Sequence, residues 1–118
     1  KLIFRHWLIN IEDDEIAIQL MNYFEAVSRR WSTAWEDTKT GNMLPRTNGF
    51  RAFMSFLRPA YNSFNTVNVV KMSSFLKLFE KISLEDNEFS TETFVPGSSG
   101  ERLLFRTLME QSELSNYD

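Results

Sequence analysis

The 118-residue sequence contains no cysteine and a single histidine. Without cysteine it can form neither a disulfide nor a thiolate metal site, and zinc sites need several cysteine or histidine ligands. His6 stands among aromatic and aliphatic residues without the partners of a catalytic set, so we interpret it as a core or interface residue. The sequence therefore predicts no enzyme, no catalytic residue, no metal and no cofactor.

Long apolar runs are also missing. No stretch approaches the roughly 20 apolar residues that cross a bilayer, so the sequence predicts no membrane partner. The lack of cysteine favours a reducing compartment, and we expect a cytoplasmic location. A composition of 42% hydrophobic and 25% charged residues is typical of a globular domain. We interpret residues 1–118 as a single helical domain, the C-terminal fragment of a longer protein that begins before Lys1.

What the sequence does contain is helical periodicity. Apolar residues recur every three or four positions in four segments, which predicts an all-α fold, a compact bundle of four or five helices. The first helix runs for about 20 residues from near Glu12, with Asn10 as its cap. The second follows a cap at Thr47 or Asn48, and Pro59 should kink or break it near Arg58.

Two further helices, and one segment whose structure the sequence leaves undecided, complete the expected fold. A third helix carries an apolar stripe from Val69 to Ile82. The last begins at Ser98, where Ser98 and Glu101 have the spacing of a capping box. Residues 1–11 alternate only in part between apolar and polar, which leaves a short N-terminal strand open as an alternative.

The net charge of -3 conceals a segregation of charge along the chain. Segment 28–81 holds nine basic and three acidic side chains, a net charge of +6, and acidic runs flank it. A polyanion would be attracted to this middle segment and repelled by the flanks. The alternative is that these charges only solvate helix faces.

The basic residues around the second helix form the candidate anion site. Arg51 and Arg58 share one polar face of this helix with Ser55 and Asn62, at 100° per residue. Unpaired N–H groups and the helix dipole favour an anion at a helix N-terminus. The candidate phosphate or DNA-binding residues are Arg46, Thr47, Gly49, Arg51 and Arg58. The alternative is that these arginines pair with the neighbouring acidic segments.

Residues 21–62, MNYFEAVSRRWSTAWEDTKTGNMLPRTNGFRAFMSFLRPAYN, resemble the C-terminal region of bacterial DGQHR-domain proteins, which include DndB-type regulators associated with DNA phosphorothioation. The resemblance rests on three short motifs: YFEAV at 23–27, WED at 35–37 and LPRTNGF at 44–50. The late PGSSGER, residues 96–102, is similar to the approach to that family's final helix. The DGQHR pentapeptide and the ParB-like fold that carries it are absent, so no activity of that half transfers.

The resemblance implies an auxiliary helical domain in a bacterial DNA-modification or defence context, with Arg46, Thr47 and Gly49 in its hinge motif. Joined to the charge pattern, it predicts a non-enzymatic regulator domain whose second helix contacts DNA backbone phosphates. The competing hypothesis is a protein–protein interaction or oligomerisation domain, which docks on the remainder of its own chain or on another copy without touching nucleic acid.

Overall fold

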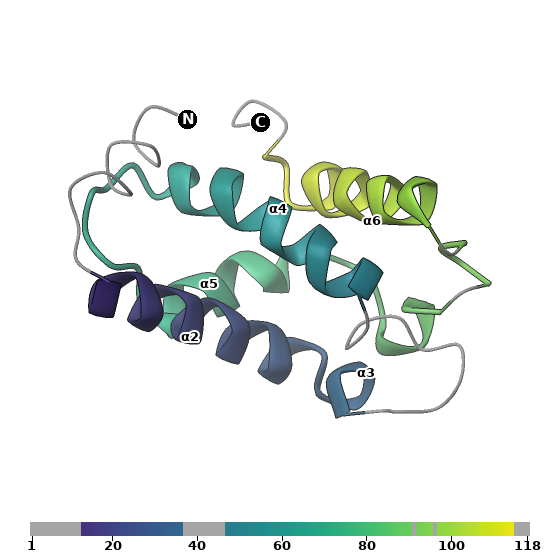
Figure 1. Cartoon of the computed structure of the whole chain (residues 1–118), viewed down its shortest axis with the longest axis horizontal. Helices are drawn as coiled ribbons and strands as arrows, with labels where there is room; N and C mark the ends of the chain where they lie inside the picture. Colours follow the sequence, from purple (N-terminus) through teal and green to yellow (C-terminus); the bar gives the residue numbers. More distant parts are fainter. Residues whose placement is uncertain (1–12, 37–46, 91, 96, 115–118) are drawn as a thin grey trace.

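A computed structural model of the chain describes residues 13–36, 47–90, 92–95 and 97–114. These residues form five α-helices and one 3₁₀ turn, with no strand, so the prediction of an all-α fold is confirmed (Figure 1). The elements in chain order are α2 (Asp13–Arg30), α3 (Ser32–Glu36), α4 (Thr47–Ser63), α5 (Met72–Glu80), η1 (Asp86–Glu88) and α6 (Ser98–Gln111). The predicted strand in residues 1–11, the Asn10 cap and His6 lie outside the described residues.

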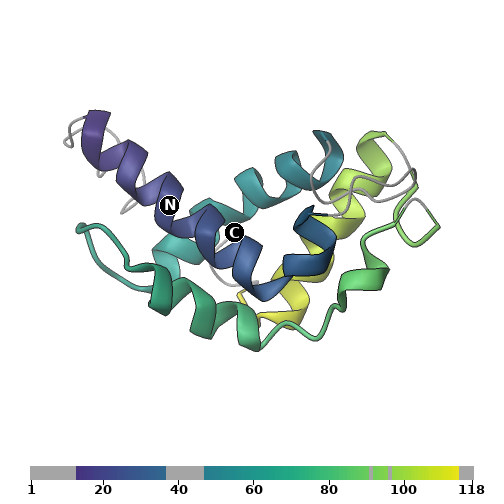
Figure 2. The same ribbon diagram turned by 90° about the horizontal axis from the view of Figure 1, so that it is seen from below.

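The helices pack mainly as two pairs, α2 against α5 and α4 against α6. The short helix α3 lies against α2 and η1, and Figure 2 shows α3 and η1 at the same end of the molecule. The molecule measures 40 × 26 × 24 Å along its principal axes. None of the helices described above is both long and apolar enough to span a membrane.

The first predicted helix is divided at Trp31. Its apolar stripe forms α2, but Trp31 is a turn residue and α3 follows it. The Trp31 side chain is fully buried, and its Nε1 donates a hydrogen bond to the Leu84 carbonyl oxygen at 2.8 Å. A residue far along the chain therefore fixes the end of α2.

Trp31 also lies at the centre of an aromatic core. Its ring centroid is 5.4 Å from those of Phe53 and Phe89 and 5.5 Å from that of Phe79. Nearby, the Tyr23 hydroxyl donates a 2.6 Å hydrogen bond to the Phe53 carbonyl oxygen. Such contacts join α2, α4, α5 and the segment after η1 into one core, and aromatic pairs in these geometries add to the stabilisation from burial.

The second helix is continuous. α4 includes Pro59, so the alternative of a break near Arg58 is wrong. Proline has no N–H, and the Ser55 carbonyl therefore lacks the partner that residue 59 would normally supply. Pro59 and the neighbouring Ala60 and Tyr61 are buried, and this packing holds the proline within the helix.

The third helix is shorter than its apolar stripe suggested. α5 begins at Met72 because Lys71, its N-cap residue, is extended, with φ -72° and ψ 152°. The preceding Val70 is bonded through its backbone to side chains of α2. Backbone groups that bond to another element are not available to start a helix earlier.

The capping box predicted at the start of α6 does not form. Gly97 is the N-cap residue, with a φ of 100° that favours glycine, and no side chain caps this end. Ser98 lies inside the helix, and the Glu101 N–H donates to the Gly97 carbonyl at 3.2 Å. A Cβ at Gly100 would lie 1.7 Å from the Val95 carbonyl oxygen, so this contact also requires glycine.

Candidate functional site

The N-terminal end of α4 was the predicted anion site. Thr47 is the first helical residue and Asn48 lies inside the helix, so neither is the N-cap residue that the sequence predicted. Arg46 lies outside the described residues. Gly49 is buried in the first turn, where no acidic residue occurs. The positive end of the helix dipole is therefore not neutralised by an acidic side chain of that turn.

Arg51 is paired with an acidic residue of α6. Its Nε lies 3.3 Å from Oε1 of Glu101, and its side chain is 65% exposed. This is the alternative that the sequence left open, an arginine pairing with a neighbouring acid. Because ion pairs at such exposure contribute about 0–1 kcal/mol, a phosphate could replace the carboxylate at little cost.

Arg58 lies on the same face of α4 and has no such partner. No described residue forms an ion pair or hydrogen bond with its guanidinium, and its Nε is buried and unpartnered. One turn further along, Asn62 is only 3% exposed, and neither its Oδ1 nor its Nδ2 has a hydrogen-bond partner. Buried polar groups without partners are uncommon and costly in folded proteins. Helical spacing puts Arg51, Arg58 and Asn62 on one face of α4, but Asn62 is buried, so the predicted polar face does not reach the end of the helix.

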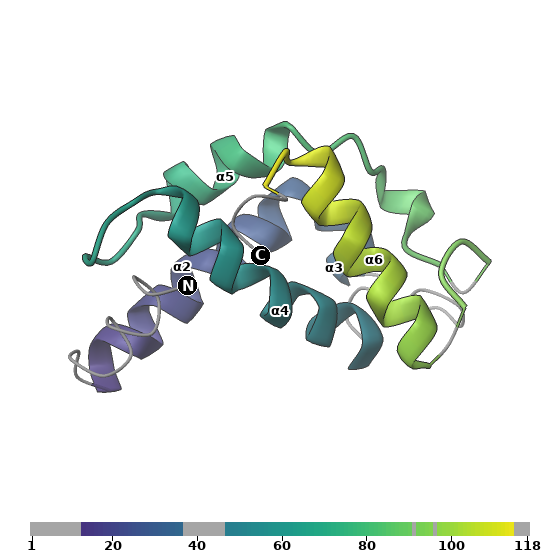
Figure 3. The same ribbon diagram turned by 90° about the horizontal axis from the view of Figure 1, so that it is seen from above.

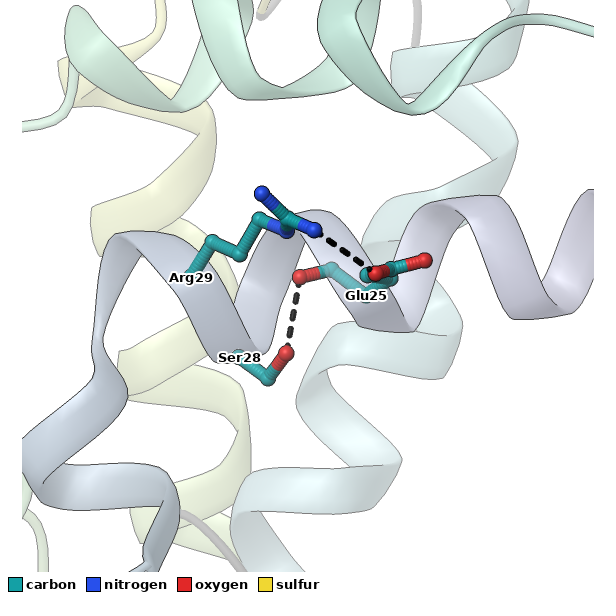
Figure 4. A network of polar contacts seen from close by, with 3 residues as sticks. All are labelled: Glu25, Ser28 and Arg29. Carbon is teal, nitrogen blue, oxygen red and sulfur yellow. Dashed lines mark hydrogen bonds and ion pairs between the residues drawn. The ribbon is translucent and has the colours of Figure 1, made fainter.

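Two arginines of the basic middle segment have structural roles. Arg29 on α2 pairs with Glu25 at 3.1 Å on an exposed surface, beside the Ser28 hydroxyl that donates to the Glu25 carbonyl (Figure 4). Arg30 donates to the carbonyl oxygens of Phe79, Ile82 and Leu84 at 3.2, 2.6 and 3.3 Å.

Arg30, which is bonded to three carbonyl oxygens, is consequently not free for an anion in the structure, whereas the exposed Arg29–Glu25 pair contributes as little as Arg51–Glu101. Arg30 also lies 4.8 Å from the centroid of the Trp31 ring. Arg30 belongs to α2, but its side chain bonds the carbonyls at and beyond the end of α5 and so caps the C-terminus of that helix. The net charge of +6 in this segment thus overstates the positive charge available to a ligand.

Two lysines that the sequence did not single out are Lys77 on α5 and Lys81, the C-cap residue of that helix. They were counted only among the nine basic side chains of segment 28–81, and neither was a candidate site residue. In the structure both line a cavity, and neither forms an ion pair within the described residues. Their spacing of four residues, with Ser74 three residues earlier, is a sequence signal for one polar helix face. Only the tertiary structure places that face beside a cavity.

The described ranges contain no candidate metal site. No group of three or more histidine, aspartate or glutamate side chains within them is arranged to hold a metal ion.

Comparisons with protein-family profiles, with curated proteins and with solved structures found no match to this chain. The resemblance to DGQHR-domain proteins therefore stays a prediction.

Proposed function

We propose that this chain is a non-enzymatic auxiliary domain of a cytoplasmic bacterial regulator linked to DNA modification or defence, and that the outer face of α4 contacts DNA backbone phosphates. The observation that carries the proposal is the Arg58 side chain, a guanidinium with no acidic partner among the described residues. The exposed Arg51 lies seven residues, or about 10 Å, away on the same face.

Such a surface would recognise the backbone and not the bases. Arginine binds phosphate oxygens through several N–H donors at once, which suits contacts that position a protein on a duplex. Each phosphate contact releases counterions, so DNA affinity should fall steeply as the salt concentration rises.

The first test is fluorescence anisotropy of a labelled duplex at low and moderate salt. The variants Arg51→Ala and Arg58→Ala should each weaken binding and reduce the salt slope by about one unit. Arg46→Ala with Arg51→Ala should lose most of the binding, because Arg46 belongs to the same predicted site. If the intact domain does not bind DNA at low salt, the proposal fails.

The Arg51–Glu101 pair offers a sharper test. Glu101→Gln removes the carboxylate that competes with phosphate for Arg51, so DNA affinity should rise. Glu110→Gln is a matched control, because it removes the same charge from an exposed position about 13 Å further along α6. Equal effects of the two variants would mean that only net charge matters and that Arg51 does not contact the phosphate.

A second candidate function is protein–protein docking, and three exposed apolar residues on α2 and α4 favour it. Met21 on α2 is 70% exposed, and Phe50 and Met54 on α4 are 48% and 38% exposed. The Phe50 ring stacks on Phe24 of α2 with a centroid separation of 5.2 Å and an interplanar angle of 13°. Exposed apolar clusters of this kind are typical of interaction surfaces.

Sedimentation equilibrium tests whether this surface joins two copies of the chain. Met21→Gln and Met54→Gln should lower the association constant without lowering stability, because both side chains are exposed. A chain that stays monomeric at all concentrations would exclude self-association. An association constant that changes little with salt would distinguish this apolar contact from phosphate binding.

A further inference from the structure

A cavity of about 470 Å³ lies where the C-terminal ends of α4 and α6 meet α5. In Figure 3, α5 extends from the end of α4 toward the end of α6. The cavity volume falls within the range of known small-molecule sites. It lies at the C-terminal end of α4, about 18 Å along the helix from Arg51 and about 8 Å from Arg58. Neither arginine lines it, so the cavity and the proposed DNA contacts use different side chains.

One wall of the cavity carries two positive charges. Lys77 on α5 and Lys81, the C-cap residue of that helix, lie four residues apart, and both line the cavity with Ser74. No described residue forms an ion pair or side-chain hydrogen bond with either amino group. Like charges at this spacing repel each other, and a bound anion would relieve the repulsion. Two ammonium groups and a hydroxyl are suitable donors for a carboxylate or a phosphate.

Three of the other six lining residues are apolar. Phe64 at the end of α4, Leu78 on α5 and Leu114 after α6 contribute to it. Leu78 and Leu114 are buried and Phe64 is half-buried, so all three belong to or border the core. These side chains can cover the hydrocarbon part of a ligand whose charged group lies on the lysines.

The acidic residue of the lining is Glu113, and its backbone conformation is unusual. Its φ is 63°, in the region that favours glycine. The N–H groups of Glu113 and Leu114 donate to the carbonyls of Glu110 and Met109 at 3.2 and 3.0 Å, the hydrogen-bond pattern of a Schellman helix end. Glu113 therefore occupies the position where glycine is most common.

We propose that this cavity binds a small amphipathic anion, a carboxylate or phosphate attached to an apolar chain or ring. Lys77, Lys81 and Ser74 hold the anionic group, and Phe64, Leu78 and Leu114 contact the apolar part. A free inorganic anion lacks the apolar contacts, and an uncharged amphiphile lacks the lysine contacts. Both parts of the ligand are needed for full affinity.

Titration calorimetry with four probes tests this proposal. The probes are octanoate, octyl phosphate, octanol and inorganic phosphate, each kept below any micelle-forming concentration. Octanoate and octyl phosphate should bind at least tenfold more tightly than octanol or inorganic phosphate. The ratio of the first two affinities distinguishes a carboxylate ligand from a phosphate ligand. If inorganic phosphate binds as tightly as octyl phosphate, the apolar part plays no role and the proposal is wrong.

Substitutions in the cavity lining test whether the ligand binds there. Lys77→Gln with Lys81→Gln should reduce octyl phosphate affinity at least tenfold, because both charged contacts are lost. Lys71→Gln is the matched control, since Lys71 is an exposed lysine next to α5 that does not line the cavity. Glu113→Gly removes the acidic side chain at a position that accepts glycine, and it should increase affinity for both anions. Unchanged affinity in the double variant would overturn the proposal.

Chemical-shift mapping in ¹H–¹⁵N spectra gives an independent readout. Octyl phosphate should shift the amides of Ser63, Ser74 and Ser112, which line the cavity, and leave those of Arg51 and Asn48 unchanged. If octyl phosphate instead displaces labelled DNA and the lysine variants lose DNA binding, the cavity belongs to a nucleic-acid surface and binds no separate ligand. Failure of the DNA proposal would leave this result intact, because the two experiments use different residues and probes.

Discussion

The side-chain amide of Gln19 pairs with both backbone groups of Val70. Its Oε1 accepts a 2.8 Å hydrogen bond from the Val70 N–H, and its Nε2 donates a 3.2 Å bond to the Val70 carbonyl. Asn22, three residues further along α2, donates to the same carbonyl at 3.0 Å. Because Gln19 is fully buried, these bonds are shielded from water and fix the extended segment that leads into α5.

Replacing Gln19 should therefore destabilise the fold strongly. In Gln19→Leu the buried Val70 N–H loses its partner, and we expect a loss of about 2 kcal/mol in the free energy of unfolding. Asn22→Ala should cost less, because the Val70 carbonyl keeps its bond from Gln19. Urea unfolding monitored by circular dichroism measures both changes. Equal losses would show that the Gln19 amide has no special role.

Asn62, a second buried amide among the described residues, should behave in the opposite way. Asn62 is buried like Gln19, but neither of its amide atoms has a hydrogen-bond partner. Asn62→Leu removes two unsatisfied polar groups at similar volume, so stability should stay the same or rise by about 1 kcal/mol. A loss greater than about 1 kcal/mol on the same urea scale would mean that the amide is bonded in solution.

Neighbouring arginines on α2 should differ in their effect on stability. Arg30→Met loses three hydrogen bonds to carbonyls and the contact with the Trp31 ring, and should cost about 2–3 kcal/mol. Arg29→Met loses one exposed pair with Glu25, which contributes about 0.5 kcal/mol or less. Thermal unfolding of the two variants, which have the same change in charge and composition, gives the comparison. A smaller shift for Arg30→Met than for Arg29→Met would contradict this assignment.

Buried tyrosines should make the protein sensitive to alkaline pH. Burial raises the pKa of Tyr61 from 10.0 to about 12, and burial also raises the pKa of Tyr23 well above its usual value. Between pH 10 and 12 the unfolded chain ionises Tyr61 and the folded chain does not. The stability from Tyr61 is therefore complete below pH 10 and falls by roughly 1.4 kcal/mol per pH unit as the pH approaches 12.

Urea unfolding at several pH values from 8 to 11.5 tests this dependence. Tyr61→Phe loses the 2.9 Å hydrogen bond to the Asn68 carbonyl, so it should be less stable than the parent at pH 8. Its stability should then fall less steeply above pH 10, because one of the two buried hydroxyls is gone. Parallel curves for the parent and the variant would exclude Tyr61 as a source of the alkaline sensitivity.

The fold class and the helices followed from the sequence, because an apolar stripe at helical spacing must be buried wherever it occurs. The periodicity identified the regions that became α2, α4, α5 and α6. It misplaced the ends where distant residues intervene. Leu84 accepts the hydrogen bond from Trp31 at the end of α2, and Gln19 holds Val70 extended before α5.

The candidate sites were likewise predicted in part from the sequence and decided in part by the tertiary structure. Helical geometry alone put Arg51 and Arg58 on one face of α4, since angular position depends only on residue spacing. Only the tertiary structure decided which cations have partners, because ion pairs and cavities join elements that are distant in sequence. It paired Arg51 with Glu101, bonded Arg30 to the carbonyls around the end of α5, and left Lys77 and Lys81 beside a cavity.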